Sequence, residues 1–586
     1  MNFFRPSSPR TSFIRLFARV VLRHPQRALA ALFWQITRRR VRAWNRLVAG
    51  AAGSRYAYDV WIAQTEREDA SGPFALPIEP SDPKLSFSIL IVADEKRALH
   101  RTLDSISAQT YQAWDIAIVA PLAEETPGSF QSDADPVWRH FPKLRDAVAQ
   151  STGHWIVPVR AGSVLAASAL SRFAAAASTH PRPVAVYGDE DRMTELGARA
   201  KPWLKPQWNQ ELFLAQDYIA GSCAIESAAL RTAAAANPSF ESLEALLLAV
   251  LFRTQREVRH VCAVTTHHPA SRPAPALDMR LAAARSLLDV EGAQAEPGPF
   301  NSIRVRWPLS AQPLVSIIVP TRDGAALLRR SCEGVLHRTR YAAIELLVVD
   351  NGSVEPETHA LFDELARDLR VRMLSWPYVF NYAAINNFAA SQARGEWLCL
   401  LNNDTEVLTS DWLEELMRHA IRPEVGAAGA RLLYEDGTIQ HAGVVIGLGQ
   451  AAGHAHRHLA SEEYGYFART HVPHYVSAVT GACLVVEKAK FDAVGGFDAE
   501  GLAIAFNDVD LCLKLQARGW KNIYVPQATL VHHESKTRTH DLSPLNAERY
   551  LRELAILQLR WNTIDFHDPL HHPGLDRSGE DYVLGL

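Results

Sequence analysis

The chain has 586 residues, of which 48% are hydrophobic and 21% are charged, and its formal net charge is -3. This is an ordinary globular composition, long enough for more than one domain, and the total charge gives no sign of a nucleic-acid-binding protein. The six cysteines are scattered without a C-x-x-C pair, which favours a reducing, cytoplasmic compartment over disulfides or a zinc cluster.

The first 50 residues are strongly basic. They contain eleven arginines and no lysine or acidic residue, so they carry +11, and the other 536 residues carry -14 because -3 minus +11 is -14. Arg15, Arg19, Arg23 and Arg27 recur every four residues, and the apolar run at 28–34 is far shorter than the roughly 20 residues that span a bilayer.

These features predict a basic amphipathic helical segment over residues 1–60. We expect it to lie on the anionic inner face of the cytoplasmic membrane, which would make the protein a peripheral membrane protein. The alternatives are a solvated basic arm or a helix that packs on the body of the protein.

Two long stretches of the chain begin alike. Short apolar runs that are separated by helical patterns predict buried parallel strands. The matching pairs of segments are 86–92 with 314–320, 114–119 with 344–349, 153–159 with 395–401, and His267-His268 with His532-His533. This internal duplication predicts an α/β fold with two tandem domains, at residues 85–268 and 313–540. A proline-rich linker at 269–312 would join them, with a helical stretch near 277–290, and a helical extension at 541–586 would follow.

Acidic residues follow two predicted strands of the second copy. Asp350 precedes Asn351-Gly352-Ser353, and Asp404 ends the run Asn402-Asn403-Asp404. The carboxyl ends of parallel strands border the ligand crevice of open α/β sheets, and a carboxylate there is suited to Mg²⁺ or Mn²⁺. Asp350 could instead organise only its own turn. Asp404 lies too far upstream to cap the helix expected from about residue 410.

A third acid lies at the start of a predicted helix that ends near Gly519. Asp508, in the run Phe506-Asn-Asp-Val-Asp510, could take a proton from a hydroxyl group. Asn507 or Asp508 could instead cap the helix. His532 follows another apolar strand, where it is either a metal ligand or a hydrogen-bonded core histidine.

The order of these motifs carries more information than any one of them. VDNGS at 349–353, NND at 402–404, GGFD at 495–498, FNDVD at 506–510 and the pair His532-His533 together resemble the family 2 glycosyltransferases. The resemblance is greatest to tandem-domain, rhamnosyltransferase-like bacterial members. It implies two GT-A domains, which have the Rossmann-like fold of nucleotide-diphospho-sugar transferases.

The resemblance also implies roles for the matching residues. Asp508 would be the catalytic base, and Asp404 and His532 would bind Mg²⁺ or Mn²⁺, with His533 as the neighbouring candidate. The nucleotide would contact Pro320, Thr321, Asp323, Asp350, Asn387 and Asn402, and the acceptor side would include Thr480, Gly481 and Asn507. Asn402 departs from the family pattern, which has an aspartate here, and this lowers the negative charge around the cation.

The implied function is an inverting, metal-dependent transfer of a sugar from a nucleotide-sugar donor to a glycan. The family suggests a lipid-linked glycan in cell-envelope polysaccharide synthesis, and no nucleic-acid partner is expected. The main alternative is a non-catalytic scaffold of a polysaccharide assembly complex. A nucleotidyltransferase is a weaker alternative, because residues 320–324 poorly resemble a glycine-rich triphosphate loop.

The first copy lacks the residues that would do this chemistry. It has Val119 to Pro121 at the position of Asp350, Arg160 to Gly162 at the NND triplet, and Ser242 at the position of Asp508. We therefore expect a degenerate domain without catalysis, whose acids at 189–191 either stabilise a turn or bind a ligand. In the second copy, His454, His456 and His458 are expected on a mobile loop over the site, or less favourably in a separate zinc site.

Overall fold

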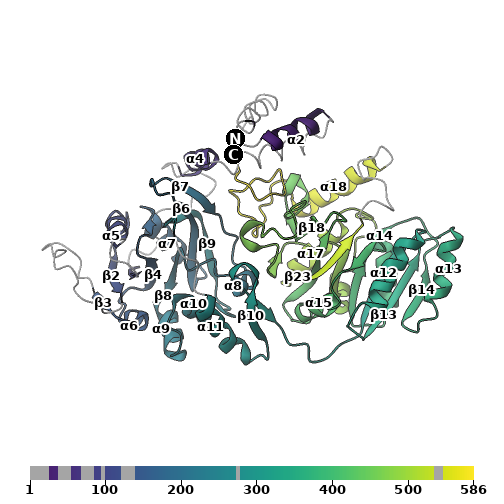
Figure 1. The fold of residues 1–586 in the computed structure, drawn as a ribbon, viewed down its shortest axis with the longest axis horizontal. Coiled ribbons are helices and arrows are strands. Elements are labelled where there is room, and N and C mark those ends of the chain that lie inside the picture. Colours follow the sequence, from purple (N-terminus) through teal and green to yellow (C-terminus); the bar gives the residue numbers. More distant parts are fainter. Residues whose placement is uncertain are drawn as a thin grey trace.

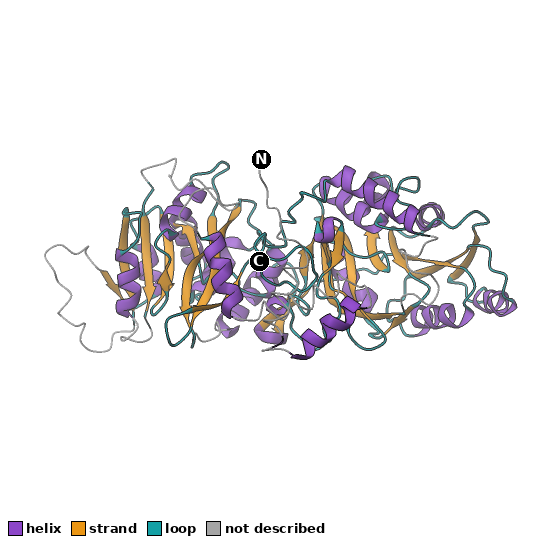
Figure 2. Cartoon of the chain, turned by 90° about the horizontal axis from the view of Figure 1, so that it is seen from above, coloured by secondary structure: helices purple, strands orange, loops and turns teal. Residues whose placement is uncertain are grey.

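The computed structural model describes residues 21, 25–36, 55–66, 85–93, 99–120, 139–271, 277–533 and 546–585. Two α/β domains lie side by side along the long axis of the molecule (Figure 1). In the view from above, helices flank the strands of each domain (Figure 2). Arg15, Arg19 and Arg23, on which the basic-helix prediction relied, lie outside the described residues.

The first domain is built on a nine-stranded sheet with the order β3-β2-β1-β4-β8-β6-β9-β5, and β7 pairs with β6. Its central strand β1 (Phe87–Val92) is apolar and buried, and it pairs in parallel with β2 and β4. The other strands are β2 (Trp114–Val119), β3 (Arg139–Phe141), β4 (Trp155–Arg160), β5 (Val164–Leu165), β6 (Ala185–Met193), β7 (Arg199–Trp203), β8 (Cys223–Glu226) and β9 (Val258–Pro269). The helices are α5 (Leu99–Ser107), α6 (Leu144–Ala149), α7 (Ala169–Ala177), α8 (Gln210–Ala215), α9 (Ser227–Ala236) and α10 (Leu243–Leu251).

The second domain has a ten-stranded sheet with the order β14-β13-β12-β15-β22-β17-β23-β16, with β18 and β21 at its side. The strands are β12 (Val315–Thr321), β13 (Ile344–Asp350), β14 (Val371–Ser375), β15 (Trp397–Leu401), β16 (Thr405–Val407), β17 (Val425–Leu433), β18 (Ile439–His441), β21 (His474–Val476), β22 (Cys483–Glu487) and β23 (Lys521–His532). The helices are α12 (Ala325–His337), α13 (Pro356–Leu365), α14 (Tyr382–Gln392), α15 (Trp412–Ala420), α16 (Lys488–Ala493) and α17 (Asn507–Ala517).

The two sheets have the same strand order, position by position. In each sheet, four parallel strands are followed by an antiparallel strand, then by a parallel pair and an antiparallel edge strand. This confirms the prediction of two tandem α/β domains from an internal duplication.

The segment at 269–312 is more than a linker. It contains α11 (Leu277–Asp289), in agreement with the expected helical stretch, and an antiparallel hairpin of β10 (Gln294–Gly298) and β11 (Ser302–Arg306). Leu281, Leu288 and Trp307 from this segment are buried in the core of the first domain. The segment therefore completes the first domain before the chain enters the second.

The ends of the chain help to join the domains. Helix α4 (Arg55–Thr65), both domains and the C-terminal segment contribute to one apolar cluster, which includes Trp61, Leu204, Leu448, Leu575 and Tyr582. Helix α18 (Ala547–Trp561) begins the C-terminal extension and packs on the second domain. The segment after it reaches the first domain, where the amide N–H of Gln207 donates to the carbonyl of Pro569.

Helix α2 (Pro25–Ile36) is also described, and it covers the apolar run at 28–34. Ala28 and Ala31 are buried, whereas Leu29, Leu32, Phe33 and Ile36 are exposed at the spacing of one helical face. Among the described helices, none is both long and apolar enough to cross a membrane.

Candidate active site

Asp404 and His532 come together at the edge of the second sheet. Asp404 lies just before β16, whose pairing with the end of β23 sets Thr405 opposite His532. The Oδ1 atom of Asp404 lies 3.0 Å from Nε2 of His532. Both side chains are buried, yet this Asp404 oxygen has no hydrogen-bond partner among the described residues.

Gln440 determines which nitrogen of His532 faces Asp404. The Nδ1 atom of His532 lies 2.7 Å from Oε1 of Gln440, a carbonyl that can only accept, so Nδ1 carries the proton. Nε2 then faces the Asp404 carboxylate, an arrangement that a proton or a cation between the two atoms stabilises. A histidine whose second nitrogen is held by a carbonyl is the usual arrangement of a metal ligand. Asp404 and His532 therefore fit a divalent cation.

Two further features agree with that fit. Burial raises the pKa of Asp404, but His532 and the neighbouring polar groups together hold the pKa below its ordinary value, so the carboxylate stays ionised. The side-chain amide of Asn402 also lies at the site, with Nδ2 3.1 Å from Nε2 of His532.

His533 points to a different set of partners. Its Nδ1 atom contacts Glu435, and its Nε2 atom lies 3.3 Å from Glu406 and 3.2 Å from the Arg330 guanidinium. Because successive residues of a strand face opposite sides, only one of the two histidines can face Asp404. In this structure that residue is His532.

Asp508 lies in the first turn of α17. The helix begins at Asn507, and Phe506, which has a left-handed φ of 62°, occupies the capping position without a side-chain cap. Capping by Asn507 or Asp508 is therefore not what the structure shows. The carboxylate of Asp508 instead accepts hydrogen bonds from the Gly481 and Val509 amides, both at 2.8 Å.

The environment of Asp508 suits a proton acceptor. Burial raises the pKa of Asp508 above its ordinary value, and this outweighs the amide hydrogen bonds and the Thr480 hydroxyl, which lower the pKa. A carboxylate with a raised pKa takes up a proton more readily near neutral pH.

A chain of hydrogen bonds joins Asp508 to the Asp404 site. The Tyr382 hydroxyl lies 3.0 Å from the carbonyl of Gly481, the residue whose N–H binds Asp508. The same hydroxyl lies 3.3 Å from Oδ1 of Asn402, and the Asn402 amide reaches His532. The predicted base, the NND triplet and the predicted metal ligands thus belong to one continuous site.

The predicted nucleotide-binding residues of β12 and β13 border the same site. Thr321 pairs with Asp350 in the register of the two strands, and the Thr321 hydroxyl accepts from the side-chain amide of Asn403 at 3.0 Å. Pro320 precedes Thr321 on β12. Asp350 accepts from the Ser353 N–H at 2.9 Å. It therefore organises its own turn, which was the alternative interpretation of this residue.

Three predicted site residues form hydrogen bonds within the protein. Asp323 accepts from the Val354 and Glu355 amides at 2.7 and 3.0 Å, and so joins two loops. Asn387 forms a pair of hydrogen bonds with the backbone of Phe497 at 2.9 Å, which hold the GGFD turn. Asn507 is buried and donates to the Ile504 carbonyl at 2.9 Å. The side-chain amide of Asn387 therefore shapes the GGFD turn with both of its polar atoms, and the Asn507 Nδ2 atom contributes to the loop before α17.

The sequence interpretation missed Tyr382 and Gln440. Tyr382 begins α14 and connects the base to the NND triplet, and Gln440 lies on β18 and orients His532. Neither residue lies in a motif that points to its role. Only the pairing of β18 with β17, beside β23, brings Gln440 to the histidine.

Helix α18 supports the segment that carries the base. Glu553 accepts from the amides of Ile504 and Ala505 at 3.1 and 2.8 Å. Asp510, on the first turn of α17, accepts from the Arg560 guanidinium and the Trp561 indole, both at 2.9 Å. The C-terminal extension therefore stabilises α17 and the loop that precedes it.

The corresponding site of the first domain is filled by protein groups. Arg160 takes the strand position of Asn402, and its guanidinium forms a 2.5 Å ion pair with the buried Glu244. Ser242 caps α10 by accepting from the Ala245 N–H. An arginine that is bound to an acid leaves neither a cation site nor a free base here.

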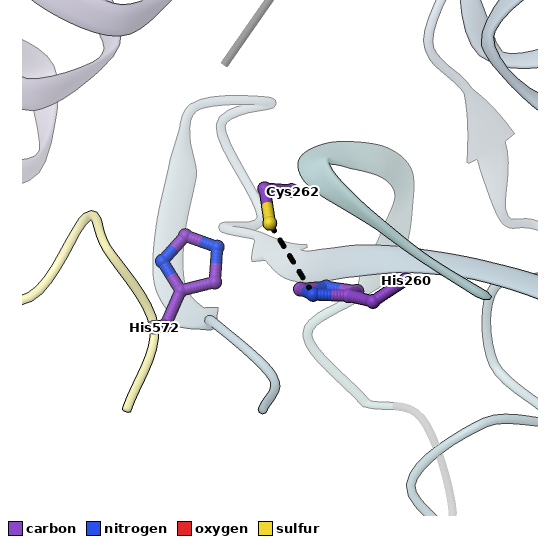
Figure 3. Close-up of side chains that lie close together, drawn as sticks. All are labelled: His260, Cys262 and His572. Atoms are coloured by element: carbon purple, nitrogen blue, oxygen red, sulfur yellow. Dashed lines mark hydrogen bonds between the residues drawn. The ribbon is translucent and has the colours of Figure 1, made fainter. Parts of the chain in front are cut away.

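The acids at 189–191 lie on strand β6, not in a turn as expected. Asp189 lies 2.9 Å from Nε2 of both His260 and His572, the latter in the C-terminal extension, and Cys262 lies beside His260 (Figure 3). Asp191 contacts Tyr58 of α4 at 2.6 Å and Arg199 at 2.6 Å. These acids hold α4 and the C-terminal extension against the first domain.

The histidines at 454, 456 and 458 do not form one cluster. His454 lies 3.0 Å from His441, His456 stacks on Tyr582 and His458 stacks on Tyr434. Burial holds the pKa values of His454 and His456 well below the ordinary value, so both rings are neutral. The segment packs between the second domain and the C-terminal extension, and the three histidines have separate partners, so they do not form the alternative zinc site.

Known proteins resemble this chain most clearly in its second domain. Residues 316–450 match the family model described as "Glycosyl transferase family 2". An uncharacterized protein of Sinorhizobium fredii is 36% identical over 93% of this chain and 61% of its own length. The O-antigen biosynthesis protein RfbC of Myxococcus xanthus is 33% identical over 83% of this chain and 40% of its own length.

A shorter match covers 11% of the chain. Over this stretch the chain is 39% identical to the N-acetylglucosaminyl-diphospho-decaprenol L-rhamnosyltransferase of Mycobacterium tuberculosis, and the match covers 21% of that protein. The chain thus spans 61% of the first of these relatives and 40% of the second.

Proposed function

This chain carries a domain of glycosyltransferase family 2, which confirms the resemblance stated from its motifs, and from that premise we propose that it is an inverting, metal-dependent glycosyltransferase. It would move a sugar from a nucleotide-sugar donor to a glycan in cell-envelope polysaccharide synthesis. The observation that carries this proposal is the continuous site in which Asp508, with its raised pKa, is linked through Tyr382 and Asn402 to His532 and Asp404.

In this proposal Asp508 is the general base. Its carboxylate accepts the proton of the acceptor hydroxyl while that oxygen attacks the anomeric carbon of the donor sugar. The bond between that carbon and the diphosphate breaks, and the nucleoside diphosphate leaves with the electron pair. A single displacement of this kind inverts the anomeric configuration.

Asp404 and His532 would hold Mg²⁺ or Mn²⁺. When bound, the cation supplies positive charge to the departing diphosphate. Gln440 keeps the His532 ring in the tautomer in which Nε2 can bind the cation. Asn402 places a neutral amide beside the cation site, where the family has a carboxylate. We expect a weaker cation site than in relatives that have two acids there.

The names of the relatives support the choice of acceptor. One is an O-antigen biosynthesis protein, and another acts on an N-acetylglucosaminyl-diphospho-decaprenol. We propose by analogy that the acceptor of this chain is a lipid-linked glycan and that the donor carries a hexose or deoxyhexose.

A lipid-linked acceptor would require access to the membrane, and the N-terminal segment could provide it. Residues 1–50 carry +11, and α2 exposes Leu29, Phe33 and Ile36 along one face. Basic charge next to an apolar face favours binding to anionic lipid surfaces. We propose a peripheral association with the inner face of the cytoplasmic membrane.

The test is a donor screen with the purified chain. UDP-, GDP- and dTDP-sugars would be incubated with lipid-linked acceptors, with and without Mn²⁺, and released nucleoside diphosphate would be measured. We expect release with one donor, dependent on Mn²⁺ or Mg²⁺ and abolished by a chelator. If no donor is bound or cleaved with any acceptor, the scaffold alternative replaces the enzyme. Vesicles with and without anionic lipid would test the membrane association, which deletion of residues 2–50 should abolish.

A further inference from the structure

A cavity of about 200 Å³ lies where the first domain meets the second. Its walls come from β6, β7, the end of α8, α11 and the turn between β10 and β11, and Phe467 of the second domain closes one side. None of the residues of the candidate active site lines it. The cavity is therefore a separate feature that glycosyl transfer in the second domain does not use.

Three polar atoms of its lining residues are buried without a partner. Gln216 Oε1, Asp217 Oδ2 and Arg280 Nε have no hydrogen-bond partner among the described residues, and Arg280 is only 3% exposed. The other groups of these side chains are used: Asp217 Oδ1 accepts from the Ile219 and Ala220 amides. A buried polar group left unpaired costs about 1–3 kcal/mol, and all three atoms belong to residues that line this cavity, which favours a polar ligand.

Aromatic rings form the other part of the lining. Trp203 stacks on Phe467 with ring centroids 4.3 Å apart and an interplanar angle of 6°. Phe300 is 49% exposed at the hairpin turn, and its ring also contacts His471 and Tyr464 of the second domain. Concave sites that combine aromatic faces with a few convergent polar groups are typical of small-molecule binding.

The cavity lining carries both signs of charge, with three acids (Glu190, Asp191 and Asp217) and three bases (Arg192, Lys201 and Arg280), which favours a ligand without a net charge. Glu190 is paired with Lys205 at 3.1 Å, and Asp191 is paired with Arg199. Asp217 has no such ion pair among the described residues, but it interacts electrostatically with the buried Arg280 guanidinium. A sugar ring has hydroxyl groups that donate and accept, and an apolar face that can pack on an aromatic ring.

We propose that this cavity binds a neutral saccharide, as a second glycan site for the polysaccharide on which the catalytic domain acts. This inference rests on the proposed function for the choice of a glycan. Gln216 and Asp217 would accept hydrogen bonds from sugar hydroxyls, Arg280 would donate one, and Phe300 would cover the ring. Such a site would hold a longer acceptor on the first domain while its end reaches the second.

The experiment is a binding titration of the full chain. The probes are di- and tetrasaccharides of rhamnose, mannose, glucose, galactose and N-acetylglucosamine, measured by calorimetry. We expect at least one to bind, with Asp217→Asn, Gln216→Ala and Phe300→Ala each weakening it by about tenfold, as the loss of one hydrogen bond or packed ring would. Asp289→Asn, an exposed acid on α11, is the matched control and should bind like the parent chain.

A second variant separates the two proposals. Asp508→Asn should lose transfer but keep saccharide binding. If the parent chain transfers sugar while no probe binds, or if the cavity variants bind as well as the parent, the second site is refuted and the proposed function stands. If the probes bind as predicted but no donor is used, the proposed function fails alone. Unchanged thermal midpoints would show that the variants remain folded.

Discussion

The Nε2 atom of His532 lies 3.0 Å from the Oδ1 atom of Asp404, although the proton of that ring is held on the opposite side by Gln440. A proton or a cation between these two atoms stabilises that arrangement. This relationship distinguishes His532 from His533 and underlies the proposed cation site.

Replacement of His532 should therefore weaken cation binding selectively. We expect His532→Ala to reduce Mn²⁺ affinity by about 10–100-fold or more, and Gln440→Leu to act in the same direction, because supporting residues of a metal site typically contribute this much. Calorimetric titration of Mn²⁺ would measure both. His533→Ala is the matched control, and an equal loss of Mn²⁺ affinity in that variant would contradict the assignment.

Asp508→Asn should retain donor binding and lose transfer. The amide cannot accept the hydroxyl proton, and loss of a general base reduces rates by about 10²–10⁴-fold. Single-turnover transfer and nucleotide titration would separate the two effects. Near-normal transfer in the variant would remove Asp508 from the proposed role.

The pH dependence of transfer should report the environment of Asp508. Burial raises its pKa above the ordinary 3.8, and only the ionised form can accept a proton. The acid limb of kcat/KM should therefore rise with pH through a pKa above 3.8, and then level off. The free energy of unfolding should change in the opposite direction. The folded state binds this proton more tightly than the unfolded state, so the protein becomes less stable as the pH rises from 3.8 through the raised pKa. Asp508→Ala should remove that slope from the pH profile of the thermal midpoint.

The contact between Asp189 and His572 should matter for stability. Both groups are buried, and leaving a buried carboxylate oxygen without its hydrogen-bond partner costs about 1–3 kcal/mol or more. We expect His572→Ala to lower the thermal midpoint and to make the C-terminal extension accessible to protease, while nucleotide binding is retained. Asp565→Asn, which alters an exposed acid of the same extension, should change neither.

The same pair predicts a loss of stability in acid. Burial raises the pKa of Asp189, but His572 and His260 together hold it well below its ordinary value. The stabilisation is therefore present above the unfolded-state pKa and is lost as the pH falls through the folded-state value. The thermal midpoint of Asp189→Asn should depend less on pH over this acidic range than that of the parent chain.

The sequence by itself determined the duplicated α/β fold and the order of the motifs. Buried strands are continuous apolar runs, and an acid at the end of such a run or within a few residues after it lies near the end of the strand, so Asp350 and Asp404 could be located from local pattern alone. The position of Asp508 at the start of a helix followed in the same way. These properties depend on neighbouring residues, and a single chain is enough to show them.

Only the tertiary structure decided which groups face one another. Gln440 meets His532, Asn387 holds Phe497, and Asp189 meets His572, although 92, 110 and 383 residues separate them in the chain. Contacts at such separations depend on how whole strands and helices pack, and a side chain reveals its partner only after that packing is known. For the same reason the sequence could not show that the acids at 189–191 hold α4 and the C-terminal extension, or that a cavity with unpaired polar atoms lies between the domains.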